Sequence, residues 1–210
     1  MNLSLNEVEA TAKRATRGAG YPWGLAEEAA KATRWLCAQD FDGCGVLARL
    51  LERRTGSDLA AWIARTDGAV WKADGGMLCP LAAGATISDR ASGLRSGEIR
   101  LQNIAEPLML LPFVAQSALQ LETTVTIAWT GGTAITDGCQ ISLEGEPGDF
   151  AEEATVRIGG SLGALTASRT RAEPDRKTLE TLNTFAHRTY APATEESRLL
   201  GAGAGLSDND

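Results

Sequence analysis

Apolar residues recur at helical spacing through the first third of the chain. In the first such stretch they lie three or four positions apart, at Leu5, Val8, Ala12 and Ala15. The flanking Ser4 and Glu7 have the spacing of a capping box, so we expect a helix over residues 5–17. Similar patterns predict further helices at about residues 25–39, 46–51 and 57–64.

The pattern changes from helical spacing to alternation beyond Gly68. Apolar and polar side chains alternate from Ala118 to Trp129, which predicts a strand of an antiparallel sheet with one covered face. Shorter patterns predict further strands at residues 69–72, 98–104, 108–114, 139–144, 154–158 and 163–169. Pro107 and Pro112 make the stretch 108–114 an edge or interrupted strand, because proline cannot donate to a strand ladder.

Helical spacing returns after Pro174 and predicts a last helix over residues 174–188. Its inner stripe consists of Leu179, Leu182, Phe185 and Ala186. Helices followed by strands and a final helix predict an α+β fold, with an N-terminal helical segment packed on an antiparallel β-sheet and followed by a C-terminal helix and an extended tail. We place these parts at residues 1–66, 67–172 and 173–210 of one integrated domain. The last helix is expected to cover part of the sheet, and three tryptophans are expected in the core: Trp62, Trp71 and Trp129.

Charge and composition exclude several classes of partner. The net charge is −7, which argues against nucleic acid and anionic membranes as main partners. The longest apolar run, from Pro107 to Ala115, is too short to span a bilayer, and no secretory signal is visible. The cysteines form no C-x-x-C pair, which is typical of reduced thiols rather than of a disulfide framework or a zinc site. We therefore expect a soluble cytoplasmic protein.

The turn GAGYPWG, which joins the first two predicted helices, carries two aromatic side chains. Its glycines permit unusual backbone angles, so Tyr21 and Trp23 could form a stacking wall for a ligand. The alternative is a helix–helix turn whose aromatic residues pack on the sheet.

The next turn, Asp40-Phe-Asp-Gly-Cys-Gly, places two carboxylates and a thiol at the start of a helix. The helix amides there could lower the pKa of Cys44 or bind an anion, and Asp40 and Asp42 are weak candidates for metal ligands. The spacing is not that of an EF-hand. More simply, Asp42 caps the following helix.

His187, the only histidine, lies near the end of the last predicted helix. It could act as a general base with Tyr190 as proton donor, and Arg49 or Arg188 could anchor a small carboxylate or amino-acid-like metabolite. Alternatively, the histidine only interacts with the last carbonyl groups of the helix.

The tail alternates glycine with alanine and then ends in acidic residues. The amides of Gly201, Gly203 and Gly205 could cradle an anion, and Asp208 and Asp210 could bind a cation. The tail matches neither a dinucleotide fingerprint nor a P-loop, and the ordinary interpretation is a flexible terminus. An ordered tail would require a compensating partner, because glycine loses much conformational freedom.

Two segments carry a family resemblance, NEVEATAKRATRGAGYPWGLAEEAAKATRWL and TYAPATEESRLLGAGAGLSDND. Through them the chain resembles, over essentially its full length, a bacterial family known only as a domain of unknown function, which implies no particular chemistry. Residues 18–51 are also similar to the N-terminal helices of the malate/L-lactate dehydrogenase family that lacks a Rossmann fold. That family has an acidic-Gly turn followed by Ser-His-Gly-Val and an arginine. Here Cys44 stands where that family has a proton-transferring histidine, Arg49 follows, and no NAD-binding stretch can be followed through residues 68–210.

No motif in the chain fixes a reaction, a metal or a cofactor, and we expect no cofactor. The favoured hypothesis is a protein that binds a small molecule, or an accessory protein, with its pocket built from the GAGYPWG turn and the C-terminal segment. The alternatives are a homo-oligomeric interaction protein that exchanges a strand and the tail between subunits, or an enzyme that uses His187 and Tyr190 on a small carboxylate.

Overall fold

Helix α1 (Leu5–Gly18) begins at the predicted capping box in the computed structural model, which describes residues 1–190. The Ser4 side chain accepts a hydrogen bond from the N–H of Glu7 at 3.2 Å, and the Glu7 carboxylate accepts one from the N–H of Ser4 at 2.7 Å. These two bonds satisfy donors that the first helical turn leaves unpaired. The apolar stripe of α1 is buried, as the spacing predicts.

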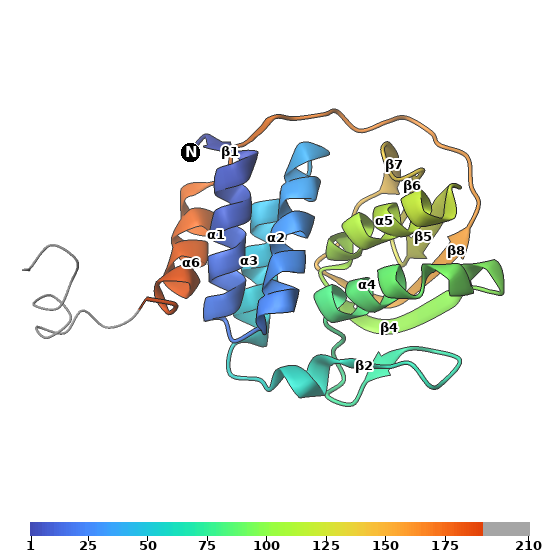
Figure 1. Cartoon of the computed structure of the whole chain (residues 1–210), viewed down its shortest axis with the longest axis horizontal. Helices are drawn as coiled ribbons and strands as arrows, with labels where there is room; N and C mark the ends of the chain where they lie inside the picture. The colour runs from blue at the N-terminus through green and yellow to red at the C-terminus, as the bar shows by residue number, and fades with distance from the viewer. Residues whose placement is uncertain (191–210) are drawn as a thin grey trace, which may run out of the picture.

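Helices α2 (Trp23–Ala38), α3 (Gly43–Arg54) and α6 (Arg176–His187) pack with α1 in a helical layer (Figure 1). The stripe predicted for α6 is buried, at Leu179, Leu182, Phe185 and Ala186. It faces α1 and α3, however, so the expectation that this helix covers the sheet is wrong. The reason is a long-range pairing: β9 (Arg171–Ala172) pairs with β1 (Leu3–Ser4) and returns the chain to the helical layer.

A five-stranded antiparallel sheet forms the other side of the molecule. It consists of β4 (Ile99–Ala105), β5 (Val125–Trp129), β6 (Gly132–Thr136), β7 (Ile141–Gly145) and β8 (Phe150–Ile158), in the order β4-β8-β5-β6-β7. The strands expected at 98–104, 139–144 and 154–158 are confirmed. The sequence pattern did not predict β6, which forms a hairpin with β5 across Gly131 at a φ of 96°. The expected α+β class is confirmed.

Three predicted strands are wrong in whole or in part. Residues 108–114 belong to a 3-10 turn, η3 (Pro107–Leu110), and to α5 (Leu111–Leu121), with a proline in the first turn of each. Proline is well suited to a first turn, whose N–H groups have no helical partner. Helix α5 also includes residues 118–121, so the strand predicted from Ala118 begins only at Val125. Residues 163–169 form no strand and touch β7 at a single bridge, between Leu165 and Ser142.

The pattern did not predict helices α5 and α4 (Pro80–Asp89). Helix α5 packs on β5 and β6 of the sheet, α4 packs on α5, and both contact α2 (Figure 1). They therefore connect the helical layer to the sheet. The remaining short elements are η1 (Leu59–Trp62), β2 (Ala64–Arg65), β3 (Lys72–Ala73) and η2 (Ala91–Arg95). One core runs through both sides and includes the three predicted tryptophans, Trp62, Trp71 and Trp129. Within residues 1–190, no helix is long and apolar enough to cross a membrane.

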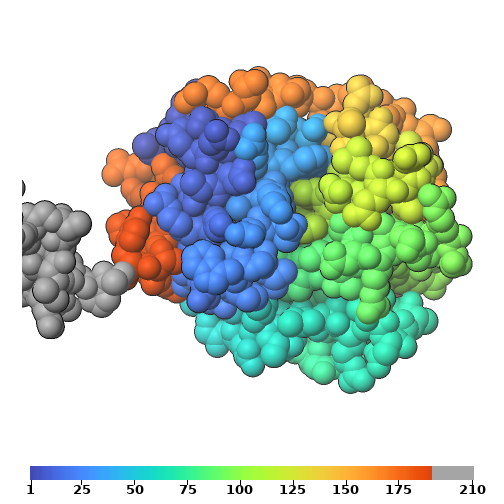
Figure 2. All heavy atoms as spheres, in the orientation of Figure 1, coloured from blue at the N-terminus to red at the C-terminus, as the bar shows by residue number. Residues whose placement is uncertain are grey.

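Residues 159–170 connect the end of the sheet back to the helical layer. This segment runs along one edge of the molecule and reaches over both sides (Figures 1 and 2). The N–H of Thr166 donates to the carbonyl of Ile141 at 3.0 Å, and the N–H of Arg169 donates to the carbonyl of Ala38 at 2.8 Å. The second bond attaches the segment to the C-terminal end of α2, where the candidate site lies.

Candidate functional site

The turn Asp42-Gly43-Cys44-Gly45 begins α3 and holds it close to the end of α2. Asp42 caps the helix, which is the simpler of the two interpretations that the sequence allowed. Its Oδ1 accepts a hydrogen bond from the N–H of Gly45 at 2.9 Å. A side chain at position 45 would overlap this carboxylate. A Cβ at position 43 would lie 2.6 Å from the carbonyl oxygen of Thr33 and 3.1 Å from Sγ of Cys37. Both glycines are therefore required by close contacts.

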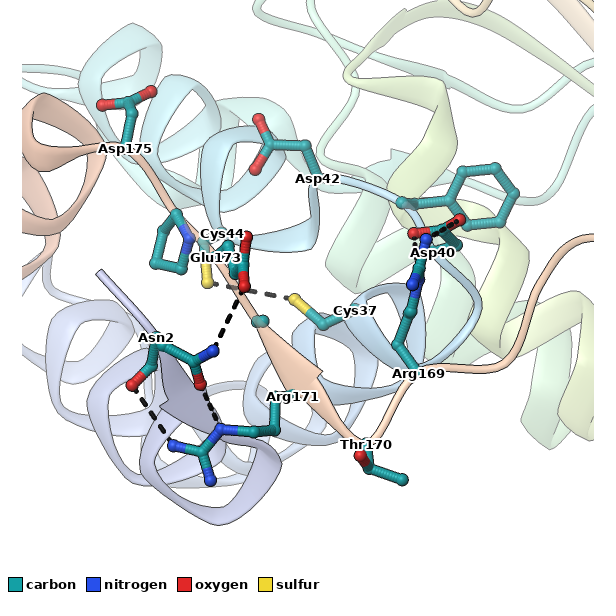
Figure 3. Close-up of a pocket in the computed structure, with 13 residues that line it drawn as sticks. Asn2, Cys37, Asp40, Asp42, Cys44, Arg169, Thr170, Arg171, Glu173 and Asp175 are labelled. Carbon is teal, nitrogen blue, oxygen red and sulfur yellow. Dashed lines mark hydrogen bonds and ion pairs between the residues drawn. The ribbon is translucent and has the colours of Figure 1, made fainter.

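This close approach brings the thiols of Cys37 and Cys44 together. The two Sγ atoms, both buried, lie 3.9 Å apart (Figure 3). Hydrogen bonding from the Cys44 thiol lowers the pKa of Cys37, and the backbone N–H groups of Cys44 and Gly43 act in the same direction. Burial acts in the opposite direction. The same contact, together with burial, raises the pKa of Cys44. The sequence suggested that the helix amides could lower the pKa of Cys44, whereas the pKa of Cys44 is raised and that of Cys37 is lowered.

Residues 169–175 form the opposite wall of the site. The Arg169 guanidinium donates to both carboxylate oxygens of Asp40, at 2.8 and 3.2 Å, and these bonds lower the pKa of Asp40. Asp40 has a φ of 66°, a left-handed conformation that aspartate tolerates and that turns the chain from α2 towards α3. The pair therefore joins the α2–α3 turn to the returning segment.

Asn2 holds the same wall from the N-terminal side. The Arg171 guanidinium donates to the side-chain oxygen of Asn2 and, at 3.3 Å, to its backbone oxygen. The Asn2 amide in turn donates to Oε1 of Glu173 at 3.1 Å (Figure 3). Since β1 and β9 pair beside these contacts, the wall is fixed by backbone as well as side-chain bonds.

A cavity of about 640 Å³ lies between the α2–α3 turn and residues 169–175. This volume falls within the range of roughly 300–1,000 Å³ that is typical of small-molecule sites. The thiols of Cys37 and Cys44 line it together with charged side chains, namely Asp40, Asp42, Arg169, Arg171, Glu173 and Asp175. We take this cavity as the candidate functional site.

The cavity is acidic. Four carboxylates and two guanidiniums line it, which gives a formal charge of 2 − 4 = −2. Asp175 caps α6 through bonds from the N–H and hydroxyl of Thr178, which engage both of its oxygens. Among the described residues, Oε2 of Glu173 and Oδ2 of Asp42 accept no hydrogen bond, so these two oxygens can bind a ligand.

This geometry does not support the prediction that Asp40 and Asp42 are metal ligands. Asp40 is paired with Arg169, and Asp42 uses one oxygen as a helix cap. In the part of the chain that the structure describes, no group of three or more His, Cys, Asp or Glu residues is arranged to hold a metal ion.

The two aromatic residues of the GAGYPWG turn face in different directions. Tyr21 is fully buried, with its hydroxyl 3.5 Å from Sγ of Cys79 and the Arg54 guanidinium 4.6 Å from its ring centroid. Burial raises the pKa of Tyr21. Trp23 is 59% exposed, and the Arg17 guanidinium lies 5.3 Å from its ring. The two rings therefore do not form one ligand wall, and the turn lies outside the cavity.

The other candidate residues in the described part of the chain lie away from the cavity lining. Arg49 pairs with Glu106, and the Arg188 guanidinium lies 4.5 Å from the ring of Phe185. His187 and Tyr190 contact each other edge to face, with ring centroids 5.4 Å apart. They lie at the end of α6 opposite to its cavity-lining N-cap, about 18 Å away for a helix of 12 residues.

The candidate residues of the tail, Gly201, Gly203, Gly205, Asp208 and Asp210, lie outside the described residues. Their proposed roles as anion or cation ligands therefore stay predictions. The same holds for the exchange of the tail between subunits.

A second cavity, of about 220 Å³, lies on the face of the sheet that carries polar side chains. It is lined by residues of β4 and β8, among them Arg100, Gln102, Glu153 and Thr155. It is small for a metabolite site, so we do not assign a function to it.

Sequence reasoning missed most of the residues that line the larger cavity. Cys37 and Cys44 are seven positions apart. This spacing predicts a contact only when the end of α2, the start of α3 and the close packing at Gly43 are all known. Arg169, Arg171 and Glu173 gave no local signal, because the pairing of β1 with β9 brings them to the site from more than 125 residues away along the chain.

Comparison with known proteins gives a family without an assigned activity. Residues 3–76 match a family described as a protein of unknown function (DUF3726). The resemblance predicted for the start of the chain is thereby confirmed, whereas the C-terminal segment lies beyond the matched range. No curated protein matches the chain.

Among solved structures, a malate dehydrogenase from Entamoeba histolytica is similar, with 11% sequence identity and a TM-score of 0.48. The match covers 70% of this chain and 49% of the dehydrogenase, so the chain spans about half the length of that protein. We infer no activity from this likeness.

Proposed function

We propose that the chain binds a small amine-bearing metabolite in the cavity between the α2–α3 turn and residues 169–175. The observation that carries the proposal is the surplus of carboxylates in a cavity of metabolite size. A concave site with a net negative charge attracts cations. The two uncommitted oxygens, on Glu173 and Asp42, are acceptors for an ammonium group.

An amino-acid-like ligand fits this arrangement better than a simple anion. A carboxylate entering the cavity would meet four acidic side chains, and the Arg169 guanidinium is already paired with Asp40. Within residues 1–190, Arg171 donates hydrogen bonds to Asn2 and to no carboxylate, so its guanidinium could bind the carboxylate of a zwitterion. We therefore expect diamines and basic amino acids to bind, and dicarboxylates not to bind.

A matched pair of ligands tests the sign of the charge. The probes are 1,5-diaminopentane and glutarate, which have similar lengths and opposite charges, with lysine as a zwitterionic third probe. We expect the diamine and lysine to raise the melting temperature of the full-length protein and to give a titratable heat by calorimetry. The effect should weaken as salt is added, because exposed charge interactions are screened.

A charge-removing variant locates the effect. Glu173→Gln keeps the size of the side chain and should weaken diamine binding about tenfold or more, since a hydrogen bond to a charged group contributes roughly 1.5–3 kcal/mol. Glu152→Gln is the matched control, because Glu152 is an exposed residue of β8 that does not line the cavity. Binding of glutarate alone, or equal binding to both variants, would refute the proposal.

The two alternative functions draw no support from the cavity. His187 and Tyr190, on which the enzyme hypothesis depends, do not line it. The homo-oligomer hypothesis depends on exchange of the alternating strand, which begins only at Val125, and of the tail, which lies outside the described residues. Both stay predictions.

A further inference from the structure

The thiol pair in the cavity has a geometry that amine binding does not explain. All four cysteines lie within the described residues 1–190, and among them only Cys37 and Cys44 have sulfur atoms in contact, at 3.9 Å. Cys79 is buried at the start of α4 beside Tyr21, and Cys139 is exposed in the turn before β7. The two sulfurs are thus neighbours, as a pair must be before it can close to the bond length of about 2.05 Å in a disulfide.

The two thiols are also chemically unequal. The Cys37 sulfur lies beside the first residue of α3, where a Cβ built on Gly43 would be 3.1 Å from it, and the positive end of a helix favours a thiolate there. Cys44 lies one residue further into the helix, with its sulfur against that of Cys37, and the pKa of Cys37 is lowered while that of Cys44 is raised. An attacking thiol with a nearby protonated partner is the arrangement of reactive cysteine pairs, since the thiolate is the nucleophile. Both buried residues are part of the cavity lining, which gives a small disulfide a place to bind beside them.

We propose that Cys37 and Cys44 form a redox-active dithiol that exchanges with small disulfides entering the cavity. Cys37 is the attacking residue and Cys44 the resolving residue. The product is an intramolecular Cys37–Cys44 disulfide and two molecules of small thiol.

Both steps balance without any other reactant. The Cys37 thiolate attacks one sulfur of the small disulfide and forms a mixed disulfide, and the sulfur that leaves takes up the proton released by Cys37. The Cys44 sulfur then attacks Sγ of Cys37, and the second small thiol leaves with the proton of Cys44. Two cysteine thiols are oxidised and one small disulfide is reduced.

The cavity also defines the substrate class, and this part of the inference rests on the proposed function. An acidic cavity favours a cationic disulfide over an anionic one. Cystamine, the disulfide of 2-aminoethanethiol, carries an ammonium group at each end. Dithiodipropionate has a similar length and a carboxylate at each end, which makes it the matched counterpart.

The first experiment uses full-length protein with the substitution Cys139→Ser, which removes the exposed thiol and leaves both members of the pair intact. This protein has three thiols, at Cys37, Cys44 and Cys79. After incubation with cystamine under native conditions, we expect two thiols to be lost without a lasting adduct, and peptide mapping to find a Cys37–Cys44 bond that dithiothreitol reverses. Retention of all three thiols while Cys139 of the natural chain reacts would overturn the proposal.

The second experiment assigns the roles. In the Cys139→Ser background, Cys44→Ser should trap the cystamine half as a stable adduct on Cys37, whereas Cys37→Ser should leave Cys44 unmodified. Adduct formation at Cys44 but not at Cys37 would overturn the assignment. Since the first experiment leaves the pair unchanged, the proposal is tested even where a serine variant fails to fold.

A third measurement separates this inference from the proposed function. In the natural chain, the rate at Cys37 is divided by the rate at Cys139 for each disulfide, so that differences in intrinsic reactivity cancel. We expect this ratio to be about tenfold or more higher for cystamine than for dithiodipropionate. Equal ratios together with a Cys37–Cys44 bond would support the redox pair and refute the amine preference of the cavity.

Discussion

Arg49 on α3 holds the buried carboxylate of Glu106, which comes directly after β4. The Arg49 guanidinium donates three hydrogen bonds to Glu106, at 2.9 to 3.2 Å, and the Glu106 side chain is 1% exposed. Glu106 also has a φ of 46°, an uncommon conformation for a side-chain-bearing residue. The pair connects the helical layer to the sheet. Arg49, which the sequence suggested as an anchor for a ligand carboxylate, is therefore bound to Glu106 instead.

Arg49→Met should destabilise the protein by about 2–3 kcal/mol. Removing one partner of a fully buried ion pair costs roughly 3–5 kcal/mol, and Arg49 is half exposed, which lowers the cost. Urea denaturation measures the change. Arg34→Met is the control, because its pair with Glu9 is exposed and should be worth at most about 1 kcal/mol. Equal losses of unfolding free energy in the two variants would show that the buried Arg49–Glu106 pair contributes no more to stability than an exposed pair.

Glu106 also gives the stability a pH dependence of known sign. Burial raises its pKa above the ordinary value of 4.5, although Arg49 opposes the effect. The folded state therefore holds this proton more tightly than the unfolded state. The associated stability is fully present below the unfolded-state pKa and is lost as the pH rises through the folded-state pKa.

Glu106→Gln removes this titration. From a pH of about 4.5 upwards, the unfolding free energy of the natural protein should fall relative to that of the variant. Urea denaturation at closely spaced pH values measures the difference between the two proteins. A difference that stays constant or rises across this range would contradict the raised pKa.

Gly43→Ala should weaken the packing of α3 on α2. The added Cβ would lie 2.6 Å from the carbonyl oxygen of Thr33 and 2.9 Å from Cβ of Leu36, so the helix start must move. Overpacking of this kind costs roughly 1–3 kcal/mol. Gly24→Ala, where a Cβ meets no atom within 4 Å, is the control, and both are read by thermal unfolding. A neutral effect at Gly43 would mean that the close approach is not tight in solution.

Asp42→Asn should lower the pKa of Cys37. The Asp42 carboxylate acts to raise it, whereas asparagine keeps the helix cap without the charge. The pH dependence of iodoacetamide alkylation at Cys37, followed by peptide mass spectrometry, reports the change. Asp58→Asn alters another capping residue, that of η1, and should leave the profile unchanged. An unchanged or raised pKa in the Asp42 variant would show that this carboxylate does not act on the thiol.

Local patterns predicted the helices of the first sixty residues well. The capping box at Ser4 and the N-cap at Asp42 have the hydrogen bonds that their spacing implies, because both motifs depend only on neighbours in the chain. The same reasoning failed at Leu119 and Leu121, whose alternation matches a strand although they lie on a helix that begins at Leu111. Two alternating positions are too few to distinguish the two-residue period of a strand from the 3.6-residue period of a helix.

The site could be predicted only in part, for a different reason. The α2–α3 turn was visible as a group of two carboxylates and a thiol, and it does line the cavity. Its opposite wall depends on the pairing of Leu3 with Ala172, which no local pattern encodes. The contact between Cys37 and Cys44 likewise depends on how closely two helices pack.

Hydrogen–deuterium exchange of the full-length protein, with and without saturating 1,5-diaminopentane, tests the location of the site most directly. The account predicts slower exchange in residues 38–45 and 169–175, and no such change with glutarate. Protection confined to the C-terminal end of α6 around His187, or no protection in either segment, would contradict it.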